Sequence, residues 1–295
     1  MQILLLAALL TALSAYNRGI PAVRCDVSTL PSVYFLLTST PDRASRLPRV
    51  FETLQAQTLQ PKGVILTVAR RYNTSRFSSE TFPERSLVYT LPARSALTPL
   101  VPTIYYVAED KGPLLKYYGA TRMLAEEPGS WLFAGTRHAS SAIVVIGDDD
   151  VFYGSTFLED FACSVHSGPA NTVYSNQIDA DCKWLGGCVM GFRGVAMRAS
   201  MLEGLEATFL SPSECFLADD VAITYWLTMV KKYTIQKLQL RTRHKLDKSF
   251  AESNSSIHQA HKSVGFRINR ACQFALKQCK MTREAVCQRD VAGFN

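Results

Sequence analysis

Residues 142–150 have the sequence AIVVIGDDD, an uninterrupted apolar run that ends in a glycine and three aspartates. Residues 142–147 predict a strand buried on both faces, because they lack the alternation of a half-exposed strand. Ligands of open α/β sheets bind at the carboxyl ends of strands, where Asp148, Asp149 and Asp150 fall. Three adjacent carboxylates repel one another, and a hard divalent cation relieves that repulsion. We therefore expect a Mg²⁺ or Mn²⁺ site completed by substrate phosphates; a solvated acidic loop is the alternative.

The segments before this strand alternate between strand and helix patterns. Residues 33–37 and 64–69 are apolar and β-prone, and the spacing of apolar residues over 47–59 predicts a helix between them. Residues 103–107 predict a third strand, and residues 116–126 a second helix. Such β-α-β units build parallel sheets. We predict an α/β fold in a single domain: an open, mostly parallel, twisted sheet with helices on both faces.

A second acidic pair, Asp219 and Asp220, opens a helix predicted over residues 219–230. Aspartate at the start of a helix caps backbone N–H groups and complements the helix dipole, which explains the pair without catalysis. A carboxylate that faces the metal site would instead serve as a general base. One residue can cap the helix while its neighbour points elsewhere, so both interpretations stay open.

Asp110 and Lys116 belong to the segment EDKGPLLK, which directly follows the strand predicted over residues 103–107. Lys116 could meet a phosphate as a point charge, and Asp110 could accept hydrogen bonds from a base or a ribose. A turn followed by a surface lysine is the alternative.

The N-terminus indicates export. Residues 3–15 form the apolar run ILLLAALLTALSA, which fits the core of a secretory signal peptide, although an uncleaved signal anchor stays open. Asn73 and Asn254 begin glycosylation triplets, and eight cysteines without a C-x-x-C pair favour disulfides over zinc. We predict a signal peptide over residues 1–15 and one domain over residues 26–295 that ends in a C-terminal helical extension. The predicted location is the lumen of the secretory pathway (ER or Golgi) or the outside of the cell.

The composition excludes some classes of protein. Hydrophobic residues make up 47% of the 295 residues, so the bulk of the chain is not disordered. The net charge of +7 is concentrated between Lys231 and Lys248, where seven basic residues oppose one acidic residue. No aromatic stacking pattern or DNA-reading motif accompanies this segment, so we expect no nucleic-acid partner. A solvated face, attraction of an anionic nucleotide donor and contact with a membrane surface stay open.

Four segments in order along the chain resemble the nucleotide-sugar glycosyltransferases of the GT-A fold, especially family-2-like members. They are LTSTPDR at 37–43, EDKGPLLK at 109–116, the triplet 148–150 as a D-x-D motif, and CFLADD at 215–220. The D-x-D pattern is weakly specific, but the ordered set is much more so. The resemblance implies a GT-A-like sheet and a metal-dependent transfer. A sugar would move from a nucleotide-diphosphate donor, foremost a UDP-sugar, to a hydroxyl of a glycan or glycoprotein acceptor.

The resemblance also implies roles for single residues. Asp150 and Asp148 would hold Mn²⁺ or Mg²⁺, and His244 would be a further metal ligand from the C-terminal part of the chain. A solvated basic segment explains His244 equally well. Asp220 would be the catalytic base of an inverting reaction and Asp219 the alternate; a retaining reaction stays open. The residues that would contact the nucleotide, the donor sugar or the acceptor are Thr38, Arg43, Asp110, Lys116, Asp148, Asp149, Trp184, Gly186 and Gly187.

Two other classes of function stay open. A nucleotidyltransferase could share the sheet and the metal carboxylates, but the glycine- and lysine-rich phosphate loop typical of that class is missing after residue 37. A non-catalytic secreted glycan-binding protein, or an inactive transferase, would keep the fold without turnover. The presence of both Asp150 and Asp220 favours an enzyme. The sequence leaves the donor sugar, the acceptor and the oligomeric state open.

Overall fold

The structure is a computed structural model. It describes residues 19–41, 43–72, 87–88, 102–108, 110–125, 141–205, 215–216, 218–242, 245–246 and 269–278. The predicted signal peptide, both glycosylation triplets and His244 lie outside these ranges. No helix within them is long and apolar enough to cross a membrane.

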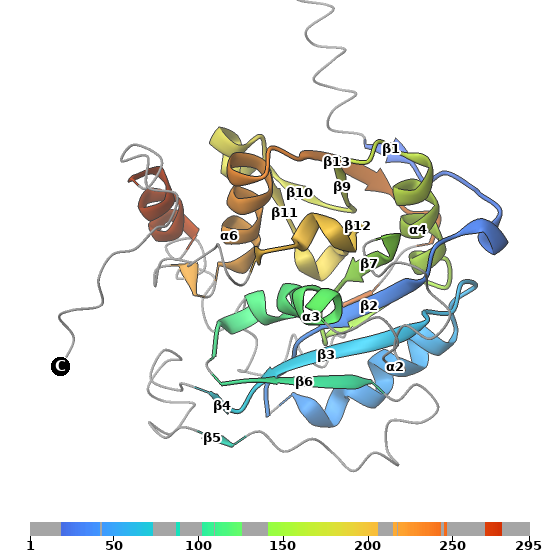
Figure 1. Cartoon of the computed structure of the whole chain (residues 1–295), viewed down its shortest axis with the longest axis horizontal. Helices are drawn as coiled ribbons and strands as arrows, with labels where there is room; N and C mark the ends of the chain where they lie inside the picture. The colour runs from blue at the N-terminus through green and yellow to red at the C-terminus, as the bar shows by residue number, and fades with distance from the viewer. Residues whose placement is uncertain are drawn as a thin grey trace, which may run out of the picture.

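The main sheet contains eight strands in the order β1-β13-β9-β12-β7-β2-β3-β6 (Figure 1). In that order the strands are Ile20–Pro21, Thr234–Gln239, Thr172–Ser175, Val195–Arg198, Ile143–Ile146, Val33–Leu37, Gly63–Ala69 and Thr103–Val107. In this sheet β12 runs antiparallel to β9 and β7, and all other neighbours are parallel. The predicted open, mostly parallel sheet is therefore confirmed.

Shorter strands form three two-stranded sheets beside the main one. They are β4 (Arg71–Tyr72) with β5 (Leu87–Val88), β8 (Val151–Phe152) with β14 (Lys245–Leu246), and β10 (Ile178–Asp179) with β11 (Cys188–Val189). The labelled α-helices are α2 (Leu47–Gln55), α3 (Leu115–Ala125), α4 (Phe157–Ser167) and α6 (Asp219–Tyr225), and a further helix covers residues 269–278.

Two predicted helices differ from the observed ones at their C-terminal ends. The helix predicted over 47–59 ends at Gln55, because the chain turns there and the N–H of Thr58 donates to the carbonyl of Ser155 at 2.8 Å. The helix predicted over 219–230 is α-helical only to Tyr225 and continues as a π-helical segment, Trp226–Val230. The amphipathic pattern alone does not report these tertiary contacts.

Helices cover both faces of the sheet, as predicted. On one face, Gly119 of α3 lies so close that a Cβ atom there would be 2.9 Å from the side chain of Ile65 and 3.5 Å from that of Leu36. On the other face, the ring of Phe157 in α4 lies 6.4 Å from the ring of Phe35. Phe35 and Leu36 are neighbours in β2, and the side chains of neighbouring strand residues point to opposite faces of the sheet. The helices α3 and α4 therefore cover opposite faces.

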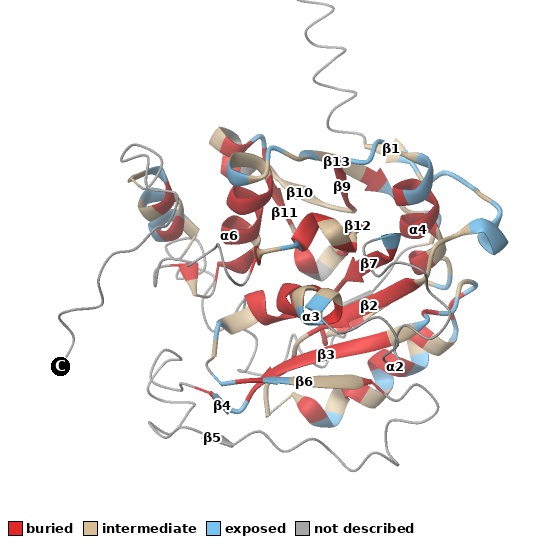
Figure 2. Ribbon diagram, in the orientation of Figure 1, coloured by how far each residue is buried: buried red, intermediate tan, exposed pale blue. Residues whose placement is uncertain are grey.

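The centre of the sheet is the core of the molecule. Every residue of β2 and β7 is buried (Figure 2). Strands covered on both faces need apolar side chains at every position, which explains why these segments lack polar alternation.

The cysteines of the described residues form three disulfides, as the sequence predicted, and none of them is free. Cys279 and Cys287 lie outside the described residues. The bonds are Cys25–Cys163, Cys182–Cys188 and Cys215–Cys272.

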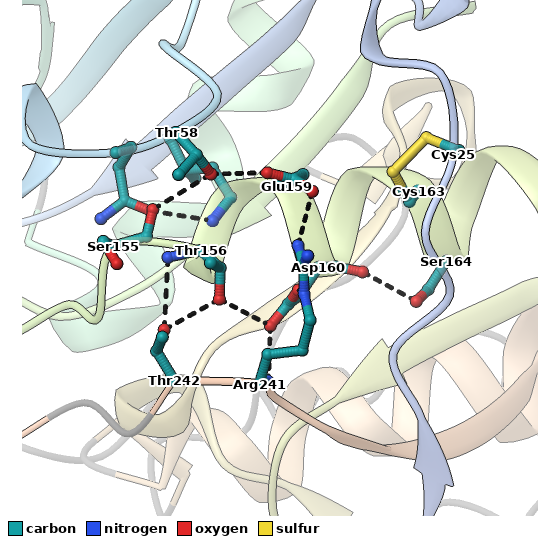
Figure 3. A network of polar contacts seen from close by, with 12 residues as sticks. Cys25, Thr58, Ser155, Thr156, Glu159, Asp160, Cys163, Ser164, Arg241 and Thr242 are labelled. Atoms are coloured by element: carbon teal, nitrogen blue, oxygen red, sulfur yellow. Dashed lines mark hydrogen bonds and ion pairs between the residues drawn. A yellow bond between two sulfur atoms is a disulfide. The ribbon is translucent and has the colours of Figure 1, made fainter.

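Arg241, which belongs to the basic segment after β13, forms an ion pair with the fully buried carboxylate of Asp160 of α4 (Figure 3). The backbone N–H of Arg241 also donates to Oδ2 of Asp160 at 2.7 Å, and its guanidinium lies 2.6 Å from Glu159. Asp160 has no exposed surface. The charge of this member of the basic segment therefore joins the chain after β13 to α4, while its side chain stays partly exposed, at 26%.

We expect Arg241→Ala to lower the free energy of unfolding by about 2 kcal/mol, because the buried carboxylate of Asp160 loses its charged partner and keeps only the donors of the residue 241 backbone and Thr156. Urea denaturation followed by circular dichroism measures this change. Glu159→Gln is the matched control, since it removes the more exposed ion pair and should cost less than about 1 kcal/mol. Equal, small losses in both variants would contradict a structural role for the pair with Asp160.

Candidate active site

The carboxyl ends of β2, β3, β6 and β7 lie at one edge of the sheet, because these strands are parallel neighbours. Ser39 and Arg43 follow β2, Asp110 follows β6, and the aspartate triplet 148–150 follows β7. Antiparallel β12 begins at the same edge, since its first residue pairs with the last residue of β7. The segment before β12, including Gly191, therefore joins this edge.

Asp149 is the buried member of the triplet, with 2% of its surface exposed. The hydroxyl of Ser39 donates to its Oδ2 at 2.5 Å, and the Arg43 guanidinium lies 2.6 Å from its Oδ1. The same guanidinium lies 2.7 Å from Oδ2 of Asp150. Burial raises the pKa of Asp149 to about 7, against the opposing charge of Arg43. Arg43 is thus an internal counter-charge of the triplet, a role that the sequence did not indicate.

Lys116 lies buried between the two acidic segments. Its Nζ atom is 2.7 Å from Oδ1 of Asp148 and 2.9 Å from Oδ2 of Asp219, and only 2% of its side chain is exposed. Burial alone would lower the pKa of Lys116, but the carboxylates of Asp148 and Asp219 raise it well above its ordinary value. A surface lysine is therefore the wrong interpretation of this residue. Its contact with the nucleotide stays a prediction.

Asp220 points to the segment before β12. Its Oδ1 accepts a hydrogen bond from the backbone N–H of Gly191 at 2.8 Å. Burial raises the pKa of Asp220 well above its ordinary value, and the charge of neighbouring Asp219 adds to this effect. Ala218 occupies the N-cap position of α6, so both aspartates follow the cap and make contacts outside the helix.

Gly191 allows this arrangement because it has no side chain. A Cβ atom there would lie 2.5 Å from Nζ of Lys116 and 3.2 Å from Oδ1 of Asp220. Any larger residue would displace one of the two charged groups. The glycine-rich run from Gly186 contains this residue, but only the tertiary structure shows which glycine of the run faces the carboxylates.

Tyr153 holds the backbone at the start of the triplet. Its hydroxyl accepts a hydrogen bond from the N–H of Asp148 and donates one to the carbonyl of Asp148, both at 2.8 Å. Its ring lies 5.1 Å from the ring of Phe35 in β2. A Cβ atom on Gly147 would overlap the hydroxyl of Tyr153, so this glycine permits the contact. The sequence carries no signal for Tyr153.

The charge balance of the site favours a bound cation. Five aspartates face two cations, Lys116 and Arg43, an excess of three negative charges when all the groups are ionised. Oδ1 of Asp150 is buried without a hydrogen-bond partner. Within the described residues, no group of three or more His, Cys, Asp or Glu side chains suits a metal. Mg²⁺ or Mn²⁺ needs only one or two carboxylates when phosphates complete its coordination, so the residues fit such an ion.

Trp184 and Gly187, which the sequence predicted near the sugar, contact packing neighbours. The Trp184 ring lies 6.0 Å from the ring of Tyr225, and its indole N–H donates to Gln273 at 3.2 Å. Gly187 has a φ of 111°, and a Cβ atom there would overlap the side chain of Ile178. Trp184 and Gly187 have packing roles in this geometry, while Gly186 also has a positive φ, of 81°. Their contact with a sugar stays a prediction.

The remaining predicted residues lie near this edge or outside the described residues. Asp110 accepts a hydrogen bond from the N–H of Gly112 at 2.8 Å, and half-buried Thr38 directly follows β2. His244 is outside the described residues, but the next residue, Lys245, begins β14, which pairs with β8 directly after Asp150. The role of His244 as a metal ligand stays a prediction.

No family model and no curated protein matches the chain. Among solved structures, 48 chains match. One is the mannosyltransferase PcManGT from Pyrobaculum calidifontis in complex with GDP-Man and Mn²⁺, at 17% identity and a TM-score of 0.48, over 89% of this chain and 67% of that one. Another is glucosyl-3-phosphoglycerate synthase from Mycobacterium tuberculosis in complex with UDP, at 9% identity and a TM-score of 0.41, over 86% and 88%. With both TM-scores below 0.5, the site residues must carry any statement about activity.

We expect Asp149→Asn to stabilise the protein at about pH 8. The pKa of Asp149 is about 7 in the folded state, above the unfolded value of about 3.9, so ionising it as the pH rises destabilises the fold. Asparagine removes this cost, and the rise in the free energy of unfolding should be larger at pH 8 than at pH 5 by on the order of 1 kcal/mol or more. Urea denaturation at both pH values measures the difference.

The control for this pH effect is Asp26→Asn. The Asp26 carboxylate is exposed and its pKa is lowered by hydrogen bonds from Ser28, so it stays ionised over this range. Its replacement should have the same effect on stability at pH 5 and at pH 8. A loss of stability at pH 8 in Asp149→Asn would show that pairing with Arg43 outweighs the cost of burial.

We expect Lys116→Met to lower the free energy of unfolding at neutral pH by about 3 kcal/mol, because the buried carboxylate of Asp219 and the half-buried carboxylate of Asp148 lose their shared partner. Chemical denaturation measures this loss. Lys62→Met replaces an exposed lysine and should change stability by less than about 0.5 kcal/mol. Similar values for the two variants would contradict the role of Lys116 as the counter-charge.

Proposed function

We propose that this protein is a glycosyltransferase that moves a sugar from a nucleotide-diphosphate donor to a hydroxyl of a glycan or glycoprotein acceptor. One observation carries the proposal: Lys116 lies 2.7 Å from Asp148 and 2.9 Å from Asp219, so the two acidic segments share one site. Carboxylates at a strand end suit a metal–diphosphate group, and a second carboxylate pair beside them supplies a base. The order of the four motifs along the chain supports the same class of enzyme.

The triplet is the proposed donor end of the site. Asp150, with its unpartnered Oδ1, and Asp148 would hold Mn²⁺ or Mg²⁺, with His244 as a third protein ligand. Such an ion, when bound, neutralises negative charge on the leaving diphosphate. Arg43 pairs with both Asp149 and Asp150 and so keeps the Asp150 carboxylate in a fixed orientation.

The nucleotide is proposed to bind along the same edge of the sheet. The groups available there are half-buried Thr38 after β2, the carboxylate of Asp110 after β6, and the ammonium group of Lys116. Carboxylate oxygens accept hydrogen bonds from ribose hydroxyls or base N–H groups, whereas an ammonium group attracts phosphate. A UDP-sugar is the first donor to test.

Asp220 is the proposed catalytic base of an inverting reaction, and Asp219 is the alternate. The N–H of Gly191 orients the Asp220 carboxylate, and burial raises its pKa, which makes it a stronger base than an exposed aspartate. Asp220 accepts the proton of the acceptor hydroxyl as the oxygen attacks the anomeric carbon, and the bond from that carbon to the diphosphate oxygen breaks. The carboxylate of Asp219 is paired with Lys116, so it is less suited to accept a proton than the carboxylate of Asp220.

We also propose that the protein works in the lumen of the secretory pathway or outside the cell. Three disulfides among the described residues support an oxidising compartment. The apolar run at residues 3–15 supports a signal peptide.

A thermal-shift screen of UDP- and GDP-sugars, with and without Mn²⁺, tests the donor class. We expect one donor to raise the melting temperature only when Mn²⁺ is present. Asp150→Ala should abolish this shift, because it removes the proposed metal ligand. Asp220→Asn should keep the shift and lower kcat by at least about 100-fold, as loss of a general base does.

The matched control is Asp26→Asn, which changes an exposed aspartate and should alter neither the shift nor kcat. Full transfer activity in both Asp150→Ala and Asp220→Asn would overturn the assignment. The absence of a shift with every donor would favour a non-catalytic glycan-binding protein.

A further inference from the structure

A disulfide anchors the segment that carries the two candidate catalytic carboxylates. Cys215 precedes Asp219 by four residues and is bonded to Cys272, which lies in the helix over residues 269–278 (Figure 1). Both cysteines are buried, with 2% and 0% of their surfaces exposed. The chain entering α6 is therefore joined covalently to a helix far away in the sequence.

The other side of the same segment packs against the loop before Lys116. Gly112 has a φ of 61°, and a Cβ atom there would overlap the carbonyl oxygen of Phe216, so the two backbones are in direct contact. The N–H of Ala218 donates to the carbonyl of Cys215 at 3.0 Å, which makes the segment a compact turn. The turn is thus held between the disulfide and the loop that leads into α3 and to Lys116.

The helix over residues 269–278 also supports the last turn of α6. Gln273 accepts a hydrogen bond from the indole N–H of Trp184 at 3.2 Å, and the ammonium group of Lys277 lies 5.4 Å from the centre of the Trp184 ring. Trp184 in turn lies against Tyr225, the last residue of α6. The helix therefore reaches α6 at its start through the disulfide and at its end through Trp184.

We propose that the Cys215–Cys272 disulfide positions Asp219 and Asp220 for the reaction, so that its reduction lowers turnover while the fold persists. The contacts to be kept are short: 2.9 Å from Lys116 to Asp219 and 2.8 Å from Gly191 to Asp220. A displacement of about 1 Å at a reacting group can lower a rate about 100-fold. Cys215 and Cys272 are positioning residues. The expected loss of turnover rests on the proposed function, whereas the restraint of α6 by the disulfide does not.

The double variant Cys215→Ala/Cys272→Ala tests this role. Its control is Cys25→Ala/Cys163→Ala, which removes a disulfide that closes a longer loop, with a separation of 138 residues against 57, and ends on α4. Hydrogen exchange of the α6 amides and steady-state kinetics are measured well below the melting temperature of each variant. We expect at least a tenfold rise in exchange over residues 219–225 and at least a tenfold loss of kcat, with the donor KM changed less than twofold. The control should change neither quantity.

Unchanged exchange and unchanged kcat in Cys215→Ala/Cys272→Ala would overturn the proposal, even with a lower melting temperature, since stability alone would then explain the bond. If the wild-type protein transfers no sugar from any donor, the proposed function fails, and the exchange in α6 still decides whether the disulfide holds the helix. If the double variant does not fold, the wild-type protein is reduced in steps with dithiothreitol. Exchange in α6 that rises with thiol labelling of Cys215 and Cys272 supports the proposal, and reduction without that rise overturns it.

Discussion

The ion pairs from Lys116 to Asp148 and Asp219 are the interaction on which the candidate site depends. Carboxylates removed from water are costly unless a cation compensates them, and Lys116 compensates one from each acidic segment. The guanidinium of Arg43 likewise compensates the negative charges of Asp149 and Asp150. Two internal cations thus allow five aspartates to share a site, and the negative charge that remains would suit the proposed divalent cation.

Close packing of backbone segments allows the ammonium group of Lys116 to be buried beside the aspartates. Gly119 lies one helical turn after Lys116, on the same face of α3, and brings this helix close to the sheet. Gly191 leaves the space that the end of the lysine side chain occupies. Gly112 permits the contact between the loop before α3 and the turn before α6. Each glycine in this group lies where two segments of the chain must approach more closely than a side chain permits.

Local patterns predicted much of the framework. The strands at 33–37 and 103–107 have the expected bounds, and those expected at 64–69 and 142–147 differ by one residue at their ends, because the ladder contacts of neighbouring strands decide where a strand stops. The ends of two helices were wrong for a similar reason, since the residues that stop them lie elsewhere in the sequence. In the triplet, the sequence predicted three acids at a strand end but not that Asp149 would be the buried one, because side-chain direction after a strand depends on the turn that follows.

The sequence by itself determined four strands of the main sheet and three helices, the presence of carboxylates at the end of a central strand, and cysteines suited to disulfides; it did not predict β9, β12, β13 or α4. These properties follow from local hydrophobic periodicity and from residue chemistry. Only the tertiary structure decided the partners: Lys116 with Asp219, Arg241 with Asp160, and Cys215 with Cys272. The physical reason is that strand order and the packing of helices on the sheet bring together residues far apart in the chain, and local periodicity does not encode that order.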